Sequence, residues 1–137
     1  MQGRAYLDLA REVLPGGSEV HWRGAAGRAY YALECRDALL RWGFTLPPRD
    51  NVHPFVRLRF NYAAEPDMKD IGKSLDKLSK LRNQADYDLS ALPVFSSAAR
   101  AQNAVQEAAS ALALLDTIDG DPARQAVAIT AIRVAFP

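Results

Sequence analysis

The chain has 137 residues, of which 49% are hydrophobic and 24% charged, and its formal net charge is +1. This composition is typical of one globular domain with its own core, 1–137. The small net charge argues against strong, non-specific nucleic-acid binding, which needs a basic surface, but it leaves a local basic patch open. The single cysteine, Cys35, excludes an intrachain disulfide.

The sequence gives no sign of membrane, metal or cofactor binding. No apolar stretch approaches the roughly 18 residues of a membrane span, and no signal-peptide pattern opens the chain. The two histidines and the cysteine are scattered without zinc-ligand spacing, and no glycine-rich phosphate loop is present. We therefore expect a soluble, cytoplasmic protein without metal or cofactor.

Residues 4–14 and 19–42 form the first two predicted helices. Pro15-Gly16-Gly17 ends the first, and Ser18 suits the N-cap of the second. Apolar residues cover more than half the circumference of 19–42, which predicts a central helix with several neighbours. Gly43 is a natural stop for it.

Further helices are predicted at 52–63, 67–89 and 96–118, with a last one starting after Asp121. Asp121 suits its N-cap, and Pro122 suits its first position. The intervening loops are short. The predicted fold class is therefore an all-α, up-and-down helical bundle of five to six mostly antiparallel helices.

The helix at 67–89 carries a charge on its apolar face. At about 100° per residue, one stripe contains an arginine among apolar residues: Met68, Ile71, Leu75, Leu78, Arg82, Ala85 and Leu89. A guanidinium on a packed face needs an anion or water. Asp86 lies one turn on, so we predict an Arg82–Asp86 pair.

Each of these features also has a purely structural interpretation. Arg82 and Asp86 can form an ion pair at a helix or subunit interface, without any chemistry. The lysines of the same helix (Lys69, Lys73, Lys77 and Lys80) indicate a solvated face, with a track for a phosphate backbone as the alternative. His53, at the start of its helix, is either a partly exposed histidine or a functional one.

Two short motifs stand out when they are taken together. Arg28-Ala29-Tyr30-Tyr31-Ala32 lies midway along the second predicted helix, and Arg82-Asn83-Gln84-Ala85-Asp86-Tyr87 ends the fourth. This pair resembles the HEPN superfamily of small all-α prokaryotic proteins. The closest likeness is to a subgroup with R-A-Y-Y-A and R-x-x-A-D-Y motifs, in which His53 matches an intervening histidine. The resemblance covers about half the chain, 18–89.

The resemblance implies a helical bundle that pairs into a homodimer. It also implies either a metal-independent endoribonuclease or a non-catalytic partner of a small nucleotidyltransferase, often in a toxin–antitoxin pair. The implied RNA- or nucleotide-binding residues are Arg28, Tyr31, Arg82 and Asn83. The implied catalytic residues are Arg82, Asp86, His53 and Tyr87.

The chain departs from the catalytic signature of that superfamily, which is an arginine followed four to six residues later by a histidine. Arg82 and Asn83 match, but no histidine follows them. Tyr87 stands five residues on and would project roughly 140° away from Arg82 on an unbroken helix. Tyrosine is a poor base at neutral pH. His53 supplies the imidazole only if tertiary structure brings it near Arg82.

Two functional hypotheses follow from the sequence. In the first, a dimeric HEPN-type domain binds RNA, a nucleotide, or a nucleotidyltransferase or antitoxin partner, with metal-independent RNA cleavage as its enzymatic form. In the second, the protein is a non-catalytic structural or interaction protein in which Arg82–Asp86 is an interface ion pair. The resemblance also implies that Tyr87 is a candidate for modification by a partner enzyme.

Overall fold

The computed structural model describes residues 3–88, 90 and 92–137, with the backbone alone at Arg49. All regular structure in these residues is helical, which confirms the predicted all-α bundle. The longer helices are α1 (Gly3–Val13), α2 (Glu19–Leu33), α4 (Val52–Tyr62), α5 (Pro66–Tyr87), α6 (Ala99–Asp119) and α7 (Pro122–Ala135). Shorter helical segments are α3 (Arg36–Arg41), η1 (Leu14–Gly16), η2 (Arg49–Asn51) and η3 (Pro93–Phe95).

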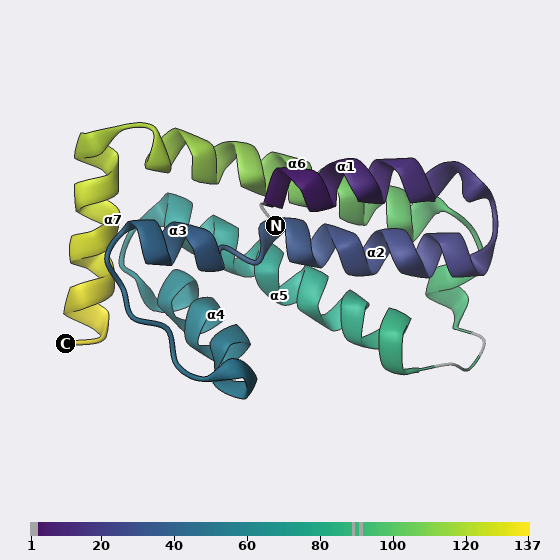
Figure 1. Ribbon diagram of the computed structural model, residues 1–137, viewed down its shortest axis with the longest axis horizontal. Coiled ribbons are helices and arrows are strands. Elements are labelled where there is room, and N and C mark those ends of the chain that lie inside the picture. The colour runs from purple at the N-terminus through teal and green to yellow at the C-terminus, as the bar shows by residue number, and fades with distance from the viewer. Residues whose placement is uncertain (1–2, 89, 91) are drawn as a thin grey trace.

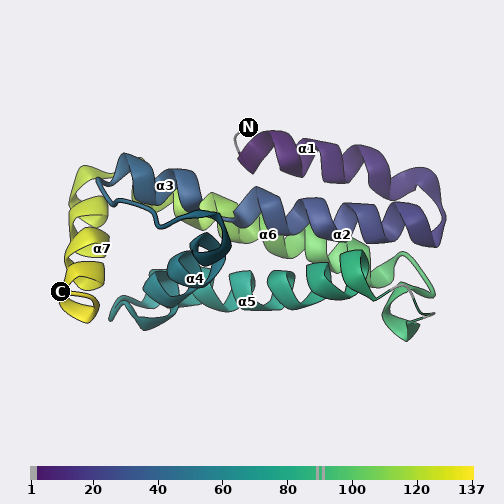
Figure 2. The same cartoon turned by 60° about the horizontal axis from the view of Figure 1, so that its bottom comes forward.

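Helices α1, α2, α5 and α6 pack side by side, and each runs opposite to the one before it in this series (Figure 1). Helix α2 packs against α1, α5 and α6, so the predicted central position of this segment is correct. Helix α4 packs against α5. Helix α7 lies crosswise at one end of the bundle in both views (Figures 1 and 2). The site described below lies where α2, α4 and α5 meet.

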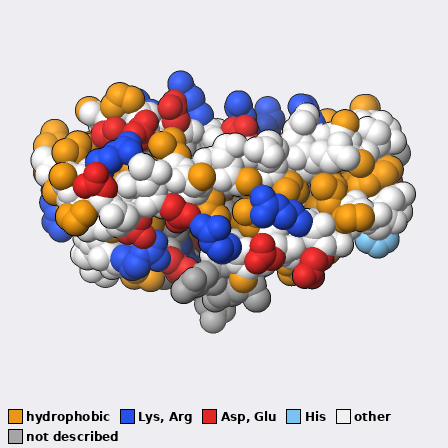
Figure 3. All heavy atoms as spheres, turned by 90° about the horizontal axis from the view of Figure 1, so that it is seen from above, with side chains coloured by type: hydrophobic (Ala, Val, Ile, Leu, Met, Phe, Trp, Pro, Cys, Tyr) orange, Lys and Arg blue, Asp and Glu red, His pale blue; other side chains and the backbone are white. Residues whose placement is uncertain are grey.

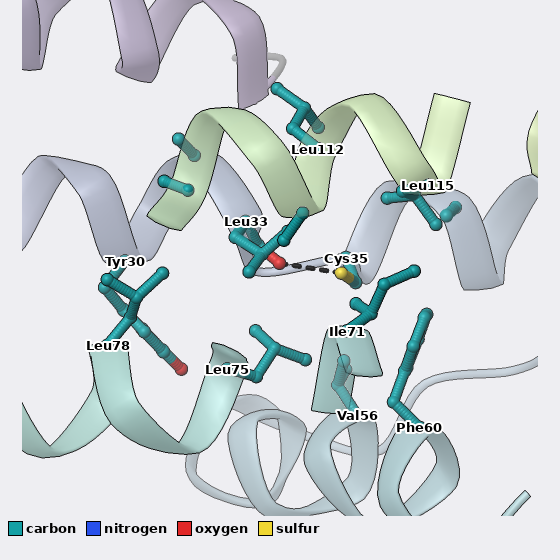
Figure 4. Close-up of a cluster of buried hydrophobic side chains, with 14 of the residues drawn as sticks. Tyr30, Leu33, Cys35, Val56, Phe60, Ile71, Leu75, Leu78, Leu112 and Leu115 are labelled. Carbon is teal, nitrogen blue, oxygen red and sulfur yellow. Dashed lines mark hydrogen bonds between the residues drawn. The ribbon is translucent and has the colours of Figure 1, made fainter. Parts of the chain in front are cut away.

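The prediction of one continuous helix over 19–42 is wrong, because the chain breaks between α2 and α3. Cys35 has a φ of 66°, in the left-handed region, and its Sγ donates a hydrogen bond of 2.7 Å to the carbonyl of Leu33 (Figure 4). Residues 33–36, where the break occurs, include no glycine or proline, so the local sequence does not signal a stop there. The break redirects α3 so that Leu39 and Trp42 are buried, with the Trp42 ring stacked on Phe60. Packing therefore overrides local helix propensity here.

A side-chain cap marks the start of α5 and α7, but not of α2, α3, α4 or α6. The side chain of Glu65 caps α5 through the N–H of Met68, and Asp121 caps α7 as predicted. Ser18 occupies the N-cap of α2, but its hydroxyl pairs with His21 instead of a backbone N–H. Helix α6 starts at Ala99, three residues later than predicted. The predicted end of α5 at Leu89 lies outside the described residues.

The predicted apolar stripe of α5 faces the core. Met68, Ile71 and Leu75 are at most 1% exposed. Figure 4 shows Ile71 and Leu75 among core residues of α2, α4 and α6. The four lysines of α5 are exposed, as both the solvated face and the phosphate track require. On the face seen in Figure 3, cationic and anionic side chains are interspersed instead of forming a wide patch of one sign. None of the described helices has both the length and the apolar character needed to cross a membrane.

Candidate functional site

Arg82 connects the two sequence motifs in space. Its side chain is 15% exposed and reaches from α5 to α2. Its Nη2 donates to the hydroxyl of Tyr31 at 2.5 Å, its Nε lies 3.0 Å from Asp86 Oδ2, and its Nη1 donates to Asn83 Oδ1 at 3.3 Å. The Nε–Asp86 contact is an ion pair whose geometry does not make a hydrogen bond. The predicted Arg82–Asp86 pair is thus present, with Tyr31 as a third partner.

Three tyrosine rings surround the guanidinium of Arg82. Its Cζ lies 5.2 Å from the ring centroids of Tyr31 and Tyr87 and 5.7 Å from that of Tyr30, which are cation–π distances. Burial lowers the pKa of Arg82. The Tyr31 hydroxyl, Tyr87 and Asp86 outweigh that effect, so the pKa is raised overall. The site therefore holds a permanent cation among aromatic faces.

Close contact between α2 and α5 supports this arrangement. A Cβ at Gly27 would lie 3.3 Å from Asp86 Oδ1, so glycine leaves room for the carboxylate that pairs with Arg82. Gly27 follows Gly24 and Ala25 in the small-residue stretch of the second predicted helix. The structure shows that the carboxylate of Asp86 takes up the space that this glycine leaves.

Arg23 fixes the end of α5 that carries the site. Its Nη1 donates to the carbonyls of Gln84, Ala85 and Asp88, and its Nη2 donates to that of Ser90 at 2.8 Å. These carbonyls include the last ones of the helix, which have no partner within it. Sequence analysis did not single out Arg23. It is one of four arginines in 19–42, and nothing in the local sequence sets it apart from the others.

His53 belongs to a second cluster on the other side of Tyr30. Its Nδ1 lies 2.8 Å from the Tyr30 hydroxyl and 3.5 Å from Glu34 Oε1. Burial and the nearby Glu34 raise the pKa of Tyr30 to about 12, so this hydroxyl stays protonated at neutral pH. The Tyr30 hydroxyl therefore lies between the ring of its own side chain and the imidazole of His53, with the Glu34 carboxylate close to that imidazole. Sequence analysis did not find Glu34 as a member of this cluster.

The structure brings most, but not all, of the predicted site residues together. Arg82, Asp86, Tyr31, Asn83 and Tyr87 form one cluster. His53 lies next to it, separated from the Arg82 guanidinium by the Tyr30 ring. Arg28 is not part of either cluster. Its Nη1 donates to the carbonyl of Gly24 one turn earlier in α2.

Tyr87 corrects one of the predictions. It is 70% exposed, as the helical wheel indicates, but its ring lies beside Arg82 and not far from it. Tyr87 is the last residue of α5, and both side chains are long enough to span the angle between them. Exposed aromatic rings beside a guanidinium are typical of sites that stack bases and contact phosphates.

In comparisons with models of known protein families, with curated proteins and with solved structures, no match to this chain was found. Among residues 3–88, 90 and 92–137, no group of three or more histidine, cysteine, aspartate and glutamate side chains is arranged to hold a metal ion. The function is therefore argued from the geometry of the site.

Proposed function

We propose that the chain is a HEPN-type RNA- or nucleotide-binding module whose site is the Arg82 cluster. The observation that supports this most is the contact between the two motifs: the Tyr31 hydroxyl of the first accepts a hydrogen bond from Arg82 of the second. The motifs are 51 residues apart in the sequence.

The cluster has the parts that single-stranded RNA recognition uses. Tyr87 offers an exposed ring for base stacking, and Arg82 offers a guanidinium. Its contact with Asn83 is the longest of its hydrogen bonds, at 3.3 Å, and lies at the exposed edge. Of the partners of Arg82, Asn83 is therefore the one that a phosphate oxygen replaces most easily. The new hydrogen bond would be charge-assisted on both sides, between a guanidinium and a phosphate. His53, one ring away, is the candidate acid–base group for metal-independent cleavage.

A second candidate function is supported by the same contacts. Tyr31, Asp86 and Asn83 together approach all three nitrogens of Arg82, which favours a structural role for this side chain. In that case the protein is a non-catalytic interaction protein. Homodimer formation and a nucleotidyltransferase or antitoxin partner belong to the proposal with either role of Arg82.

The test is binding of fluorescently labelled single-stranded RNA, followed by anisotropy in EDTA, with the same samples run on a gel for cleavage. We expect Tyr87→Ala, which removes an exposed ring, to weaken binding by about 1–3 kcal/mol while the fold is kept. Arg82→Ala should abolish binding. Arg100→Ala, an exposed arginine of α6 outside the site, is the matched control and should bind as the wild type does.

Two outcomes decide between the candidates. RNA binding that depends on Tyr87 and Arg82 supports the binding module, and cleavage in EDTA that is lost in His53→Ala supports its enzymatic form. Absence of saturable RNA or nucleotide binding by the folded wild type would refute the proposal and leave the structural role.

A further inference from the structure

Arg57 of α4 is a partly buried arginine whose guanidinium makes no hydrogen bond. Its side chain is 35% exposed, its Nε is buried, and none of its nitrogens donates to an acceptor within the described residues. Its ion-pair partner, Asp76 of α5, is 51% exposed and lies 3.9 Å from Nη1, which is too far for a hydrogen bond. A guanidinium that is partly removed from water needs an acceptor. Arg57 can therefore bind an anion from outside the chain.

Arg57 lies next to the Arg82 cluster. It follows His53 by one turn of α4, so both side chains project from the same side of that helix. Burial and Glu34 raise the pKa of Tyr30, and the charges of Arg57 and Arg82 act against that rise, because both guanidinium groups lie near its hydroxyl. His53 contacts the same hydroxyl at 2.8 Å. Two arginines and one imidazole thus surround a single tyrosine hydroxyl.

A groove of about 430 Å³ between α4 and α5 is lined by Arg57 and by side chains around it on α4. Its apolar part includes Leu58 and Tyr62, which are one turn apart and 42% and 64% exposed. Tyr62 is the last residue of α4, as Tyr87 is the last residue of α5. An exposed ring beside an arginine can stack a base while the guanidinium binds a phosphate. The groove therefore offers the same pair of groups as Arg82 and Tyr87.

Helix α5 connects the groove with the Arg82 cluster. Helix α4 lies along the first half of α5 only, in both views (Figures 1 and 2). Asp76, at the groove, and Tyr87 are about three turns and roughly 16 Å apart on α5, so they face the same side of the helix. The exposed Lys80 lies between them on that side. This distance exceeds the length of one nucleotide, so only a strand reaches both tyrosines.

We propose that the RNA site extends along α5 into this groove, where Arg57 binds a second phosphate and Tyr62 stacks a second base. The ligand is accordingly a single-stranded RNA of several nucleotides, and a mononucleotide fills only part of the site. A strand that contacts both arginines passes His53, the candidate acid–base group. This inference rests on the proposed function of the Arg82 cluster.

The test is the anisotropy of a labelled oligouridylate of about ten nucleotides, titrated with the whole chain in EDTA at several salt concentrations. For a single strand, each phosphate contact contributes about 0.7 to the slope of log affinity against log salt concentration. We expect Arg57→Gln to weaken binding by about tenfold and to reduce the magnitude of the slope by about 0.7. Arg57→Lys keeps the charge and should keep the slope.

Two further measurements test the base contact and the length of the ligand. Tyr62→Ala should weaken binding by about tenfold without a change of slope, because it removes stacking and no charge. The wild type should bind the labelled dinucleotide UpU at least about tenfold more weakly than the longer strand, because UpU reaches only one of the two tyrosines. Arg100→Gln, an exposed arginine of α6, is the control and should bind as the wild type does. Circular dichroism checks the fold of each variant.

The outcomes separate this inference from the function on which it rests. Absence of saturable binding of the longer strand by the folded wild type would overturn both. Binding that is lost in Arg82→Ala, but keeps its affinity and its salt slope in Arg57→Gln and Tyr62→Ala, would overturn the extended site alone. Equal affinity for UpU and the longer strand would do the same.

Discussion

Arg82 is the residue on which both functional candidates depend, and its surroundings make it hard to replace. Its three nitrogens approach an anion, a hydroxyl and an amide oxygen on two helices. An ammonium cannot reproduce this, since lysine lacks the planar fork of arginine. Asp86 is 39% exposed, so water screens the ion pair in part, and its contribution is smaller than that of a fully buried pair.

We expect Arg82→Ala to lower the free energy of unfolding by about 1–3 kcal/mol, because it removes two hydrogen bonds of the guanidinium and leaves the Tyr31 hydroxyl and Asp86 without their partner. Arg82→Lys should lose less, because it keeps the charge near Asp86. Urea denaturation followed by circular dichroism measures both. Lys80→Ala, an exposed position on the same helix, is the control. If the two Arg82 variants were as stable as the wild type, the contacts described here would have no structural role.

At the scale of the helices, two glycines that look alike in sequence have opposite surroundings. A Cβ at Gly72 of α5 would come within 2.9 Å of the backbone N of Asn61, so α4 and α5 touch there. A Cβ at Gly24 of α2 would meet only side-chain atoms at 3.4 Å, which is an ordinary contact. Only one of the two glycines is therefore required by packing.

Gly72→Ala should lower the free energy of unfolding by about 1–3 kcal/mol, because α4 must move away from α5. Gly24→Ala should raise it by up to about 1 kcal/mol, because alanine is the better helix former and has the room it needs. Thermal and urea denaturation of the pair measure the difference. The same sign in both variants would contradict the helix contact seen between α4 and α5.

At the scale of the whole molecule, Asp119 forms hydrogen bonds that connect three segments at one end of the bundle. At the end of α6, it accepts hydrogen bonds from Arg41 of α3, from Trp42 and from Gln125 of α7. Burial raises the pKa of Asp119, but these hydrogen bonds and the charge of Arg41 outweigh it and hold the pKa below its usual range. Three segments of the chain thus depend on one ionised carboxylate.

The consequence is a contribution to stability that depends on pH. A carboxylate whose pKa is lowered in the folded state stabilises the protein at any pH above its unfolded-state pKa of about 4. This stabilisation is lost as the pH falls through the folded-state pKa. We therefore expect Asp119→Asn to be less stable than the wild type at neutral pH, with a shallower further loss in acid. Chemical denaturation of both proteins at several values between about pH 7 and about pH 3, a range that includes the ordinary aspartate pKa, measures the two stability curves. Asp8→Asn serves as the control on an exposed carboxylate. Parallel curves for wild type and Asp119→Asn would rule out the assigned role.

The sequence by itself determined the helices and the position of the unusual arginine. Apolar spacing and capping residues are local properties, so five of the six predicted helices are found as single helices, and Arg82 lies on the packed face of α5 with Asp86 beside it. The resemblance to HEPN motifs also pointed to two segments that the structure shows in contact through Tyr31 and Arg82.

Only the tertiary structure decided the rest, since it depends on contacts between residues far apart in the chain. The break at Cys35 follows from burial of α3 and not from local propensity, so no periodicity predicts it. The placement of His53 next to Tyr30 and Glu34 needs α4 to fold back onto the end of α2. The hydrogen bonds of Arg23 arise in the same way, because its side chain on α2 reaches backbone carbonyls more than 60 residues further along the chain, at the end of α5.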